Sequence, residues 1–230
     1  MRTSLTVAVA AGLALAGCRS PLPPASDPAS IRAQICAQTP GVVECLHAVE
    51  QHFLADAPAG VERAGETLVV HPSSGSPIEL TDSPPSAEAA EVTLYGYAGF
   101  LPEVPAHLVQ VQHYEGSNYL LIDLDGKATD LDDLPVLSPD RNRFVTASGG
   151  AYAEDRVEIW LITPHGVAQE FSFSPCSWSP AEARWLSERE IEVTKTLVVP
   201  GSTDDEPSSA AQPAHLRLED DGWWVYDKTR

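Results

Sequence analysis

The sequence predicts a mainly β fold of the α+β class, with a small helical part near its N-terminal end. Short apolar runs follow one another from Glu66 to the C-terminus, and Gly, Pro, Asp and Ser residues separate them. Two segments with helical spacing precede these runs, and a Pro-rich stretch precedes the helices. We therefore divide the chain into a leader (residues 1–17), a tether (18–30), a helical hairpin (31–57) and a β domain (58–230).

The helical hairpin is predicted from two start signals and one apolar face. Asp27-Pro28 and Thr39-Pro40 each place a capping side chain before a proline, which is favoured at the first position of a helix. In the second segment Val42, Leu46, Val49 and Phe53 are spaced by four, three and four residues. We expect this hairpin to pack against a sheet.

The β domain is predicted from runs with strand propensity between turn signals. The run 157–163 is apolar on both faces, so it should lie inside a layered structure, whereas the run that begins at Glu190 alternates acids with Ile191 and Val193. Residues 200–213 are acidic and rich in Pro, Ser and Ala, which predicts a loop. The predicted strands are 67–71, 77–82, 92–100, 107–114, 118–123, 144–147, 157–163, 167–173, 190–199, 216–218 and 223–226.

The N-terminus has the layout of a secretory signal. Arg2 precedes an apolar run of about a dozen residues, which is too short to cross a bilayer as a helix. The run ends in Leu15-Ala16-Gly17-Cys18, which resembles the lipobox of bacterial lipoproteins. The resemblance implies cleavage before Cys18 and acylation of that residue, which gives durable membrane anchoring. A plain secretory signal that ends in Ala-Gly-Cys is the alternative.

The tether and the anchor together predict a place in the cell. Pro21, Pro23, Pro24 and Pro28 favour a semi-extended spacer between the lipid and the folded part. Arg19 follows Cys18, and by resemblance to sorting rules for enterobacterial lipoproteins this favours the outer membrane, facing the periplasm.

With Cys18 assigned to lipid, three cysteines remain. Cys36 and Cys45 are close in sequence and lie on adjoining helical segments, so we favour a disulfide between them in an oxidising compartment. Cys176 would then be a lone thiol, which is most often a small buried side chain.

The formal net charge of −19 falls to −20 when residues 1–17, which contain Arg2 and no acid, are removed. A balance this acidic disfavours nucleic acid and anionic lipid headgroups, and it favours a cationic protein partner. Solubility alone is the other explanation of the charge.

Part of the β domain resembles β-propeller repeats. Ser138-Pro139-Asp140 and the strand after it resemble the turn and strand of such a repeat, and Trp178-Ser179-Pro180 is similar to a degenerate second copy. The similarity covers residues 118–199, which is too short for a closed propeller of four or more blades. We therefore expect a curved sheet or a sandwich with propeller-like strand repeats. The segment from Tyr95 to Asp140 is also similar to uncharacterised bacterial proteins.

No local motif predicts catalysis, a metal or a cofactor. His47 and His52 are five residues apart, so they diverge around a helix, and Asp123 and Asp125 fit a hairpin turn better than a calcium loop. Trp223 and Trp224 are adjacent in a predicted strand and must face opposite sides. Either of them could lie exposed as a binding anchor.

These observations favour a lipid-anchored, non-catalytic binding module of the cell envelope. A concrete version is an inhibitor or immunity protein that captures a cationic envelope enzyme. The alternatives are a structural or assembly lipoprotein of the envelope, and a hydrolase without a recognisable motif.

Overall fold

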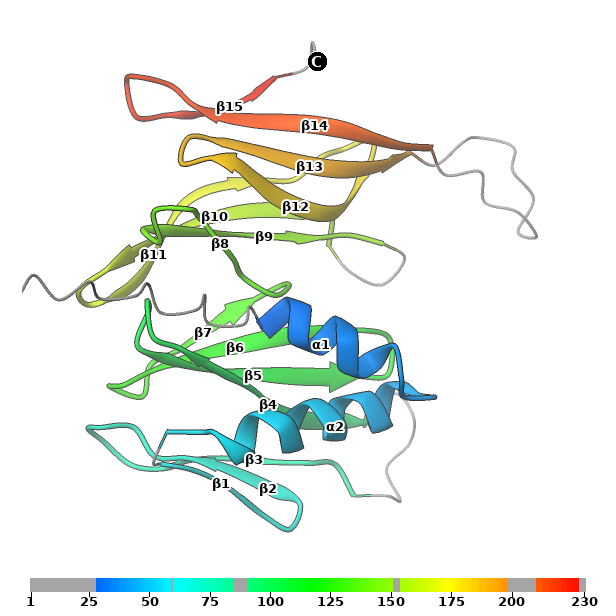
Figure 1. Cartoon of the computed structure of the whole chain (residues 1–230), viewed down its shortest axis with the longest axis vertical. Helices are drawn as coiled ribbons and strands as arrows, with labels where there is room; N and C mark the ends of the chain where they lie inside the picture. Colours follow the sequence, from blue (N-terminus) through cyan, green and yellow to red (C-terminus); the bar gives the residue numbers. More distant parts are fainter. Residues whose placement is uncertain (1–27, 59, 85–90, 151–153, 198–209, 228–230) are drawn as a thin grey trace, which may run out of the picture.

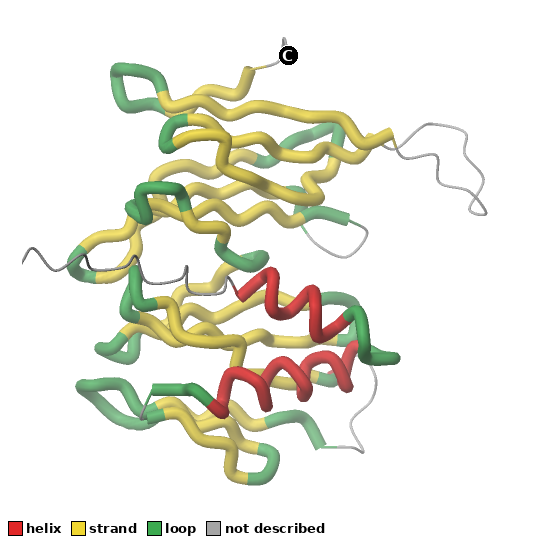
Figure 2. The backbone as a smooth tube through the Cα atoms, viewed as in Figure 1, coloured by secondary structure: helices red, strands yellow, loops and turns green. Residues whose placement is uncertain are grey.

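The computed structural model describes residues 28–58, 60–84, 91–150, 154–197 and 210–227. It is mainly β, with four antiparallel sheets and two helices (Figures 1 and 2). The predicted mainly β class with an N-terminal helical pair is therefore confirmed. The strands form four separate sheets and do not merge into one curved sheet.

The helices are α1 (Pro28–Cys36) and α2 (Val42–Ala55). The first begins at the proline that the sequence predicts and starts three residues before the predicted hairpin. The second begins at Val42, with Gly41 at the N-cap position and no side-chain cap, so Thr39 does not cap it. A disulfide joins Cys36 at the end of α1 to Cys45 in α2.

Each sheet is an antiparallel meander whose strands are adjacent in chain order. The sheets follow one another along the long axis of the molecule, from the first at the bottom of Figure 1 to the fourth at the top. The first sheet contains β1 (Val61–Ala64), β2 (Thr67–Val70) and β3 (Ile78–Thr81). The second contains β4 (Thr93–Leu101), β5 (Ala106–His113), β6 (Ser117–Asp123) and β7 (Ala128–Leu131). The third contains β8 (Val136–Leu137), β9 (Arg143–Ser148), β10 (Arg156–Thr163) and β11 (Gly166–Phe173). The fourth contains β12 (Ser179–Ser187), β13 (Glu190–Leu197), β14 (Ala210–Leu218) and β15 (Trp224–Asp227).

The predicted C-terminal boundary of the loop at 200–213 is wrong. Residues 210–213 belong to β14, and residues 200–209 lie outside the described part of the chain. Among the described residues, Pro213 pairs with Thr194 of β13, and the pairing of β14 with β15 begins at His215. A proline, which has no N–H, fits where a strand has a free side.

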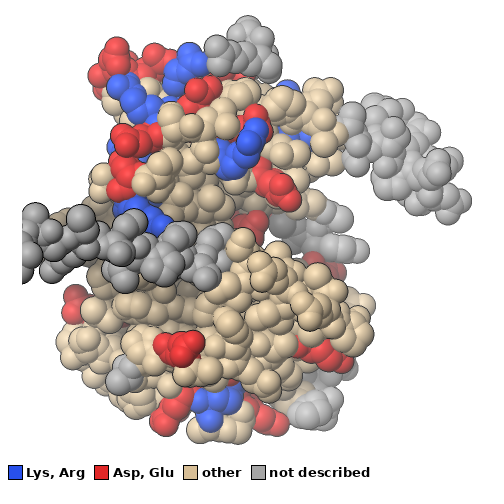
Figure 3. Space-filling view, in the orientation of Figure 1, with Lys and Arg blue, Asp and Glu red and all other residues tan. Residues whose placement is uncertain are grey.

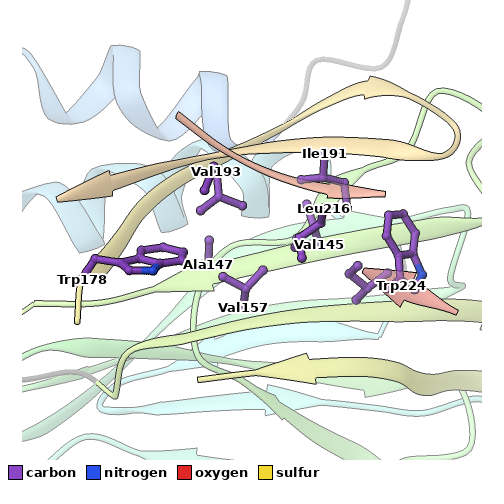
Figure 4. Close-up of a cluster of buried hydrophobic side chains, with 10 residues drawn as sticks. Val145, Ala147, Val157, Trp178, Ile191, Val193, Leu216 and Trp224 are labelled. Carbon is purple, nitrogen blue, oxygen red and sulfur yellow. The ribbon is translucent and has the colours of Figure 1, made fainter. Parts of the chain in front are cut away.

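Each pair of successive sheets encloses an apolar cluster. Leu68 and Val109 lie between the first and second sheets, and Leu108 and Phe144 lie between the second and third. The cluster between the third and fourth sheets is shown in Figure 4 and consists of Val145, Ala147, Val157, Ile159, Trp178, Ile191, Val193, Ala214, Leu216 and Trp224.

Strand β10 is apolar on both faces because its sheet lies between two others. Val157 and Ile159 belong to the cluster shared with the fourth sheet, while Trp160 and Ile162 pack on the cluster shared with the second. The predicted interior position of this strand is therefore confirmed.

Helix α2 packs closely on β4. Leu46 lies over Gly96, where any Cβ atom would come within 2.4 Å of the leucine Cδ1 atom. Only glycine allows this approach without displacing Leu46. Helix α2 therefore packs on the second sheet.

A buried ionic network fixes α2 to the first two sheets. Arg63 of β1 donates from Nε and Nη2 to the two carboxylate oxygens of Glu50, each at 2.7 Å, and from Nη1 to Asp82 Oδ2 at 3.2 Å. Asp82 Oδ1 in turn accepts the backbone N–H of Tyr95 at 2.7 Å. The side chain of Glu50 is only 6% exposed, so its charge depends on Arg63 for compensation.

We expect Arg63→Met to destabilise the fold by about 3–5 kcal/mol, because it leaves the Glu50 carboxylate buried without a partner. Urea unfolding followed by far-UV circular dichroism measures the loss. The double variant Glu50→Gln, Arg63→Met should regain part of it. A loss below about 1 kcal/mol in the single variant would contradict this role.

A second buried carboxyl lies between the second and third sheets. Glu158 of β10 is 4% exposed and accepts a hydrogen bond from Gln169 Nε2 at 2.7 Å. Burial raises the pKa of Glu158, and the negative charge of Asp132 raises it further, against the attraction of Arg156. The folded state therefore favours the protonated carboxyl. As the pH rises from the pKa of this group in the unfolded chain through its higher pKa in the folded chain, the free energy of unfolding decreases.

Glu158→Gln should raise the melting temperature near pH 7, because it removes the ionised form and keeps an oxygen that can accept the bond from Gln169. Each kcal/mol gained corresponds to about 2–4 °C for a chain of this size. Near pH 4 the gain should shrink, since the wild-type carboxyl is then protonated. Melting curves at both pH values test this, and an equal gain at both would be inconsistent with a titration effect.

Candidate functional site

The two adjacent tryptophans divide between surface and core. Trp223 is 72% exposed, whereas Trp224 is 6% exposed and belongs to the cluster between the third and fourth sheets. Trp224 Nε1 donates to Glu170 Oε2 at 3.0 Å, and Arg143 holds the same carboxylate with two hydrogen bonds of 2.7 and 3.0 Å. These bonds from Arg143 lower the pKa of Glu170. Trp224 therefore does not serve as a surface anchor, and that part of the sequence prediction is wrong.

Trp223 lies at the end of a well-defined turn between β14 and β15. Gly222 has a φ of +88°, a conformation that favours glycine, and its N–H donates to Glu219 O at 3.1 Å. The N–H of Trp223 donates to Asp221 Oδ1 at 3.2 Å, and Glu219 N–H donates to Trp223 O at 2.9 Å. The turn's own hydrogen bonds thus fix the backbone that carries the exposed indole.

The turn between β12 and β13 is joined to this one. Arg189 Nη2 donates to Leu218 O and to Asp220 Oδ1, each at 2.9 Å, and Leu218 N–H donates to Arg189 O at 2.9 Å. We call the two segments 187–190 and 219–223 the acidic turn pair. Figure 3 shows acidic and basic side chains gathered at this end of the fourth sheet, at the upper left.

Carboxylates outnumber cations in and beside the acidic turn pair. This region holds five acidic residues and two arginines, which are Glu188, Glu190, Glu219, Asp220, Asp221, Arg189 and Arg217. Asp220 is paired with Arg189, and Glu190 lies near Arg217 at 3.7 Å. Within the described part of the chain, no cation lies at ion-pair distance from Glu188, Glu219 or Asp221. This surface therefore has negative charge available for a cationic ligand.

A larger cleft lies elsewhere, between α2, the end of β4 and the start of the third sheet. Its volume is about 930 Å³, within the range of small-molecule pockets. Its walls are largely apolar, and Arg141 and Glu103 form an ion pair among its polar lining groups. The lining also includes Ile31, His52, Phe53, Asp56, Tyr97, Phe100, Leu101, Val136, Leu137 and Ser138.

Two polar groups at the cleft, Tyr97 and Ser138, are engaged in hydrogen bonds within the protein. The Tyr97 hydroxyl lies 3.2 Å from His107 Nδ1, and burial raises the pKa of Tyr97 and lowers that of His107, so both are neutral at neutral pH. The Ser138 hydroxyl donates to Asp140 Oδ1 at 2.6 Å and accepts the N–H of Arg143 at 3.0 Å. Among the described lining residues, no serine or cysteine is hydrogen-bonded to a histidine that could activate it. The cleft has the volume of a small-molecule pocket, but its described lining shows no assembled nucleophile.

The four cysteines fall into three groups: one outside the described residues, two in a disulfide and one free thiol. Cys18 lies outside the described residues, so the lipidation site stays a prediction. Cys36 and Cys45 are bonded to each other, and Cys176 is free and exposed, although the sequence favoured a buried thiol there. In the described parts of the chain no helix is long and apolar enough to span a bilayer.

The other groups considered for metal binding form surface structure. His47 and His52 are both exposed on α2, and Asp123 Oδ1 accepts the N–H groups of Asp125 and Lys127 in a hairpin turn. Over the described ranges, no three histidine, cysteine or acidic side chains gather as a possible metal site.

The chain was compared with known protein families and with curated proteins. No known protein family matches the chain, and no curated protein matches its sequence.

Trp223→Ala and Trp224→Ala should differ sharply in stability. Truncation of the buried Trp224 removes core volume and the bond to Glu170, which should cost about 3–5 kcal/mol. The same change at the exposed Trp223 should stay within about 0.5 kcal/mol. Chemical unfolding of both variants measures the difference, and equal losses would show that the assignment of surface and core is wrong.

Proposed function

We propose that the protein is a non-catalytic binding module, held in the bacterial outer membrane through a lipid on Cys18 and facing the periplasm. Its partner is a cationic protein of the envelope, and the concrete form is an inhibitor or immunity protein for a basic envelope enzyme. The lipobox-like segment Leu15-Ala16-Gly17-Cys18 supports the anchor, and the Pro-rich tether supports a folded part that stands off the lipid surface.

The observation that carries the cationic partner is the charge of −20 on the mature chain, together with Glu188, Glu219 and Asp221, which have no ion-pair partner among the described residues. Complementary charge accelerates encounter with a basic surface and disfavours acidic competitors. An exposed tryptophan beside those carboxylates supports a contact that also buries apolar area.

We further infer a propeller-like repeat within the β domain. Three four-stranded antiparallel meanders follow one another in the chain, and the Ser138 turn that enters β9 has its hydroxyl hydrogen-bonded to Asp140. The second copy is less regular, because Ser179 and Pro180 lie inside β12 and do not form a turn. These features support repeated strand units arranged as an open series.

The test is a pull-down from envelope extract with the mature chain at about 0.1 M and about 1 M salt, where the Debye length falls from about 10 Å to about 3 Å. We expect a basic protein to be retained at low salt and largely released at high salt. Failure to recover any basic partner at low salt would overturn the capture proposal.

The two alternatives predict different results in the same experiment. A structural or assembly lipoprotein should retain envelope components with little dependence on salt. A hydrolase should turn over envelope substrates, and substitutions in the cleft near Tyr97, such as Phe100→Ala, should then lower turnover while leaving salt-sensitive capture unchanged.

A further inference from the structure

We propose that the acidic turn pair is a docking site for one lysine or arginine side chain of the partner, with the cation on the face of the Trp223 indole. Glu219 and Asp221 of the same turn supply the opposing charge. This inference rests on the proposed function and deepens it, because it assigns the contact to particular residues and to a chemical class of ligand.

The exposed indole is the first part of the argument. Trp223 is 72% exposed and Val225, two residues on, is 46% exposed, so two apolar side chains stand in water at one edge of the fourth sheet. Tryptophan is the ring that attracts cations best, and the contact becomes stronger when a bound partner excludes water from it. A long basic side chain can also cover apolar surface with its methylene groups.

The fixed geometry of the turn is the second part. The N–H groups of Glu219, Gly222 and Trp223 are all used in hydrogen bonds within the turn. These amides are not available to an anion, whereas Glu219 and Asp221 are exposed acidic residues. A rigid turn also lowers the entropy lost when a partner is bound.

The third part is a cation that this surface already binds. The guanidinium of Arg189 is held by the Leu218 carbonyl and the Asp220 carboxylate, each at 2.9 Å from Nη2. Arg189 thereby occupies Asp220 and leaves Glu219 and Asp221 for a second cation. The turn pair thus contains one arginine already paired with Asp220, and beside it Trp223 with two carboxylates that have no ion-pair partner within the described ranges.

The experiment uses the full mature chain and a synthetic hexa-arginine peptide, with a Gly-Ser peptide of equal length as the neutral probe. Fluorescence anisotropy of labelled peptides measures binding at about 0.1 M salt. Trp223→Leu removes the π face and keeps an apolar side chain, and it should weaken hexa-arginine binding about two- to fivefold. Trp223→Phe, which keeps a weaker aromatic face, should give a smaller loss.

The charge requirement needs a matched control. The variant Glu219→Gln, Asp221→Asn removes two charges and keeps the Oδ1 acceptor for the Trp223 N–H. The variant Glu44→Gln, Glu79→Gln removes two exposed charges from α2 and the first sheet and has the same net charge. We expect the first to weaken binding several-fold more than the second.

The outcomes separate the two proposals. If the wild-type chain binds neither peptide, or binds both equally, the proposed capture of a cationic partner fails. A different result would leave capture intact but overturn the docking site. In that case the wild-type chain binds hexa-arginine in a salt-sensitive manner, Trp223→Leu binds it with the same affinity, and the two charge variants lose the same amount of affinity. Capture would then depend on net charge alone. Unchanged melting curves for the Trp223 variants exclude a folding effect as the cause of any loss.

Discussion

The two middle sheets are apolar on both faces, and the architecture depends on this constraint. A sheet with two apolar faces is stable only when each face is covered, and here the second and third sheets are covered by each other and by the outer sheets. The outer face of the fourth sheet, by contrast, carries an ion pair. On the fourth sheet, Glu192 pairs with Arg184 at 2.7 Å, and its neighbours Ile191 and Val193 point inward to the core.

The helical pair closes one side of this layered body, and a charged network sets its position. Arg63 connects α2, the first sheet and β4 through Glu50, Asp82 and the Tyr95 carbonyl. A buried ion pair adds little net stability compared with an apolar pair of the same size. It does disfavour other placements of the helix, because they would leave a buried charge without its partner. The close contact between Leu46 and Gly96 also restricts the position of α2, because a larger residue at position 96 would displace Leu46.

The sequence predicted the elements whose pattern is local and missed those that packing creates. The two helices could be read from their proline start signals and from one apolar face, and the inner strand from its two apolar faces. Strand β1 contains Glu62 and Arg63, and β12 contains Pro180, so neither has the alternation of an ordinary strand. Strand β12 is held in part by the third sheet, through the Trp185 indole that donates to Val136 O at 2.8 Å.

The candidate sites were predictable only in part for the same reason. Alternation required Trp223 and Trp224 to face opposite ways, but which one is exposed depends on the side of the fourth sheet that meets the third. The juxtaposition of Arg189 with Leu218 and Asp220 follows from the register of β13 and β14, which pairs Glu190 with Arg217. The cleft needs the helices, β4 and the Ser138 turn together, and no local signal marks it.

The cleft and the acidic turn pair are separate surfaces, so the place where a partner binds distinguishes a charge-driven binding module from a protein that works through the cleft. Hydrogen–deuterium exchange of the mature chain, with and without the basic protein recovered from envelope extract, locates that contact. We expect slower exchange in residues 187–190 and 219–225 and unchanged exchange around the cleft in residues 99–103 and 136–141. Protection confined to the cleft, with none at the turns, would contradict the central claim that the acidic end of the fourth sheet is the binding surface.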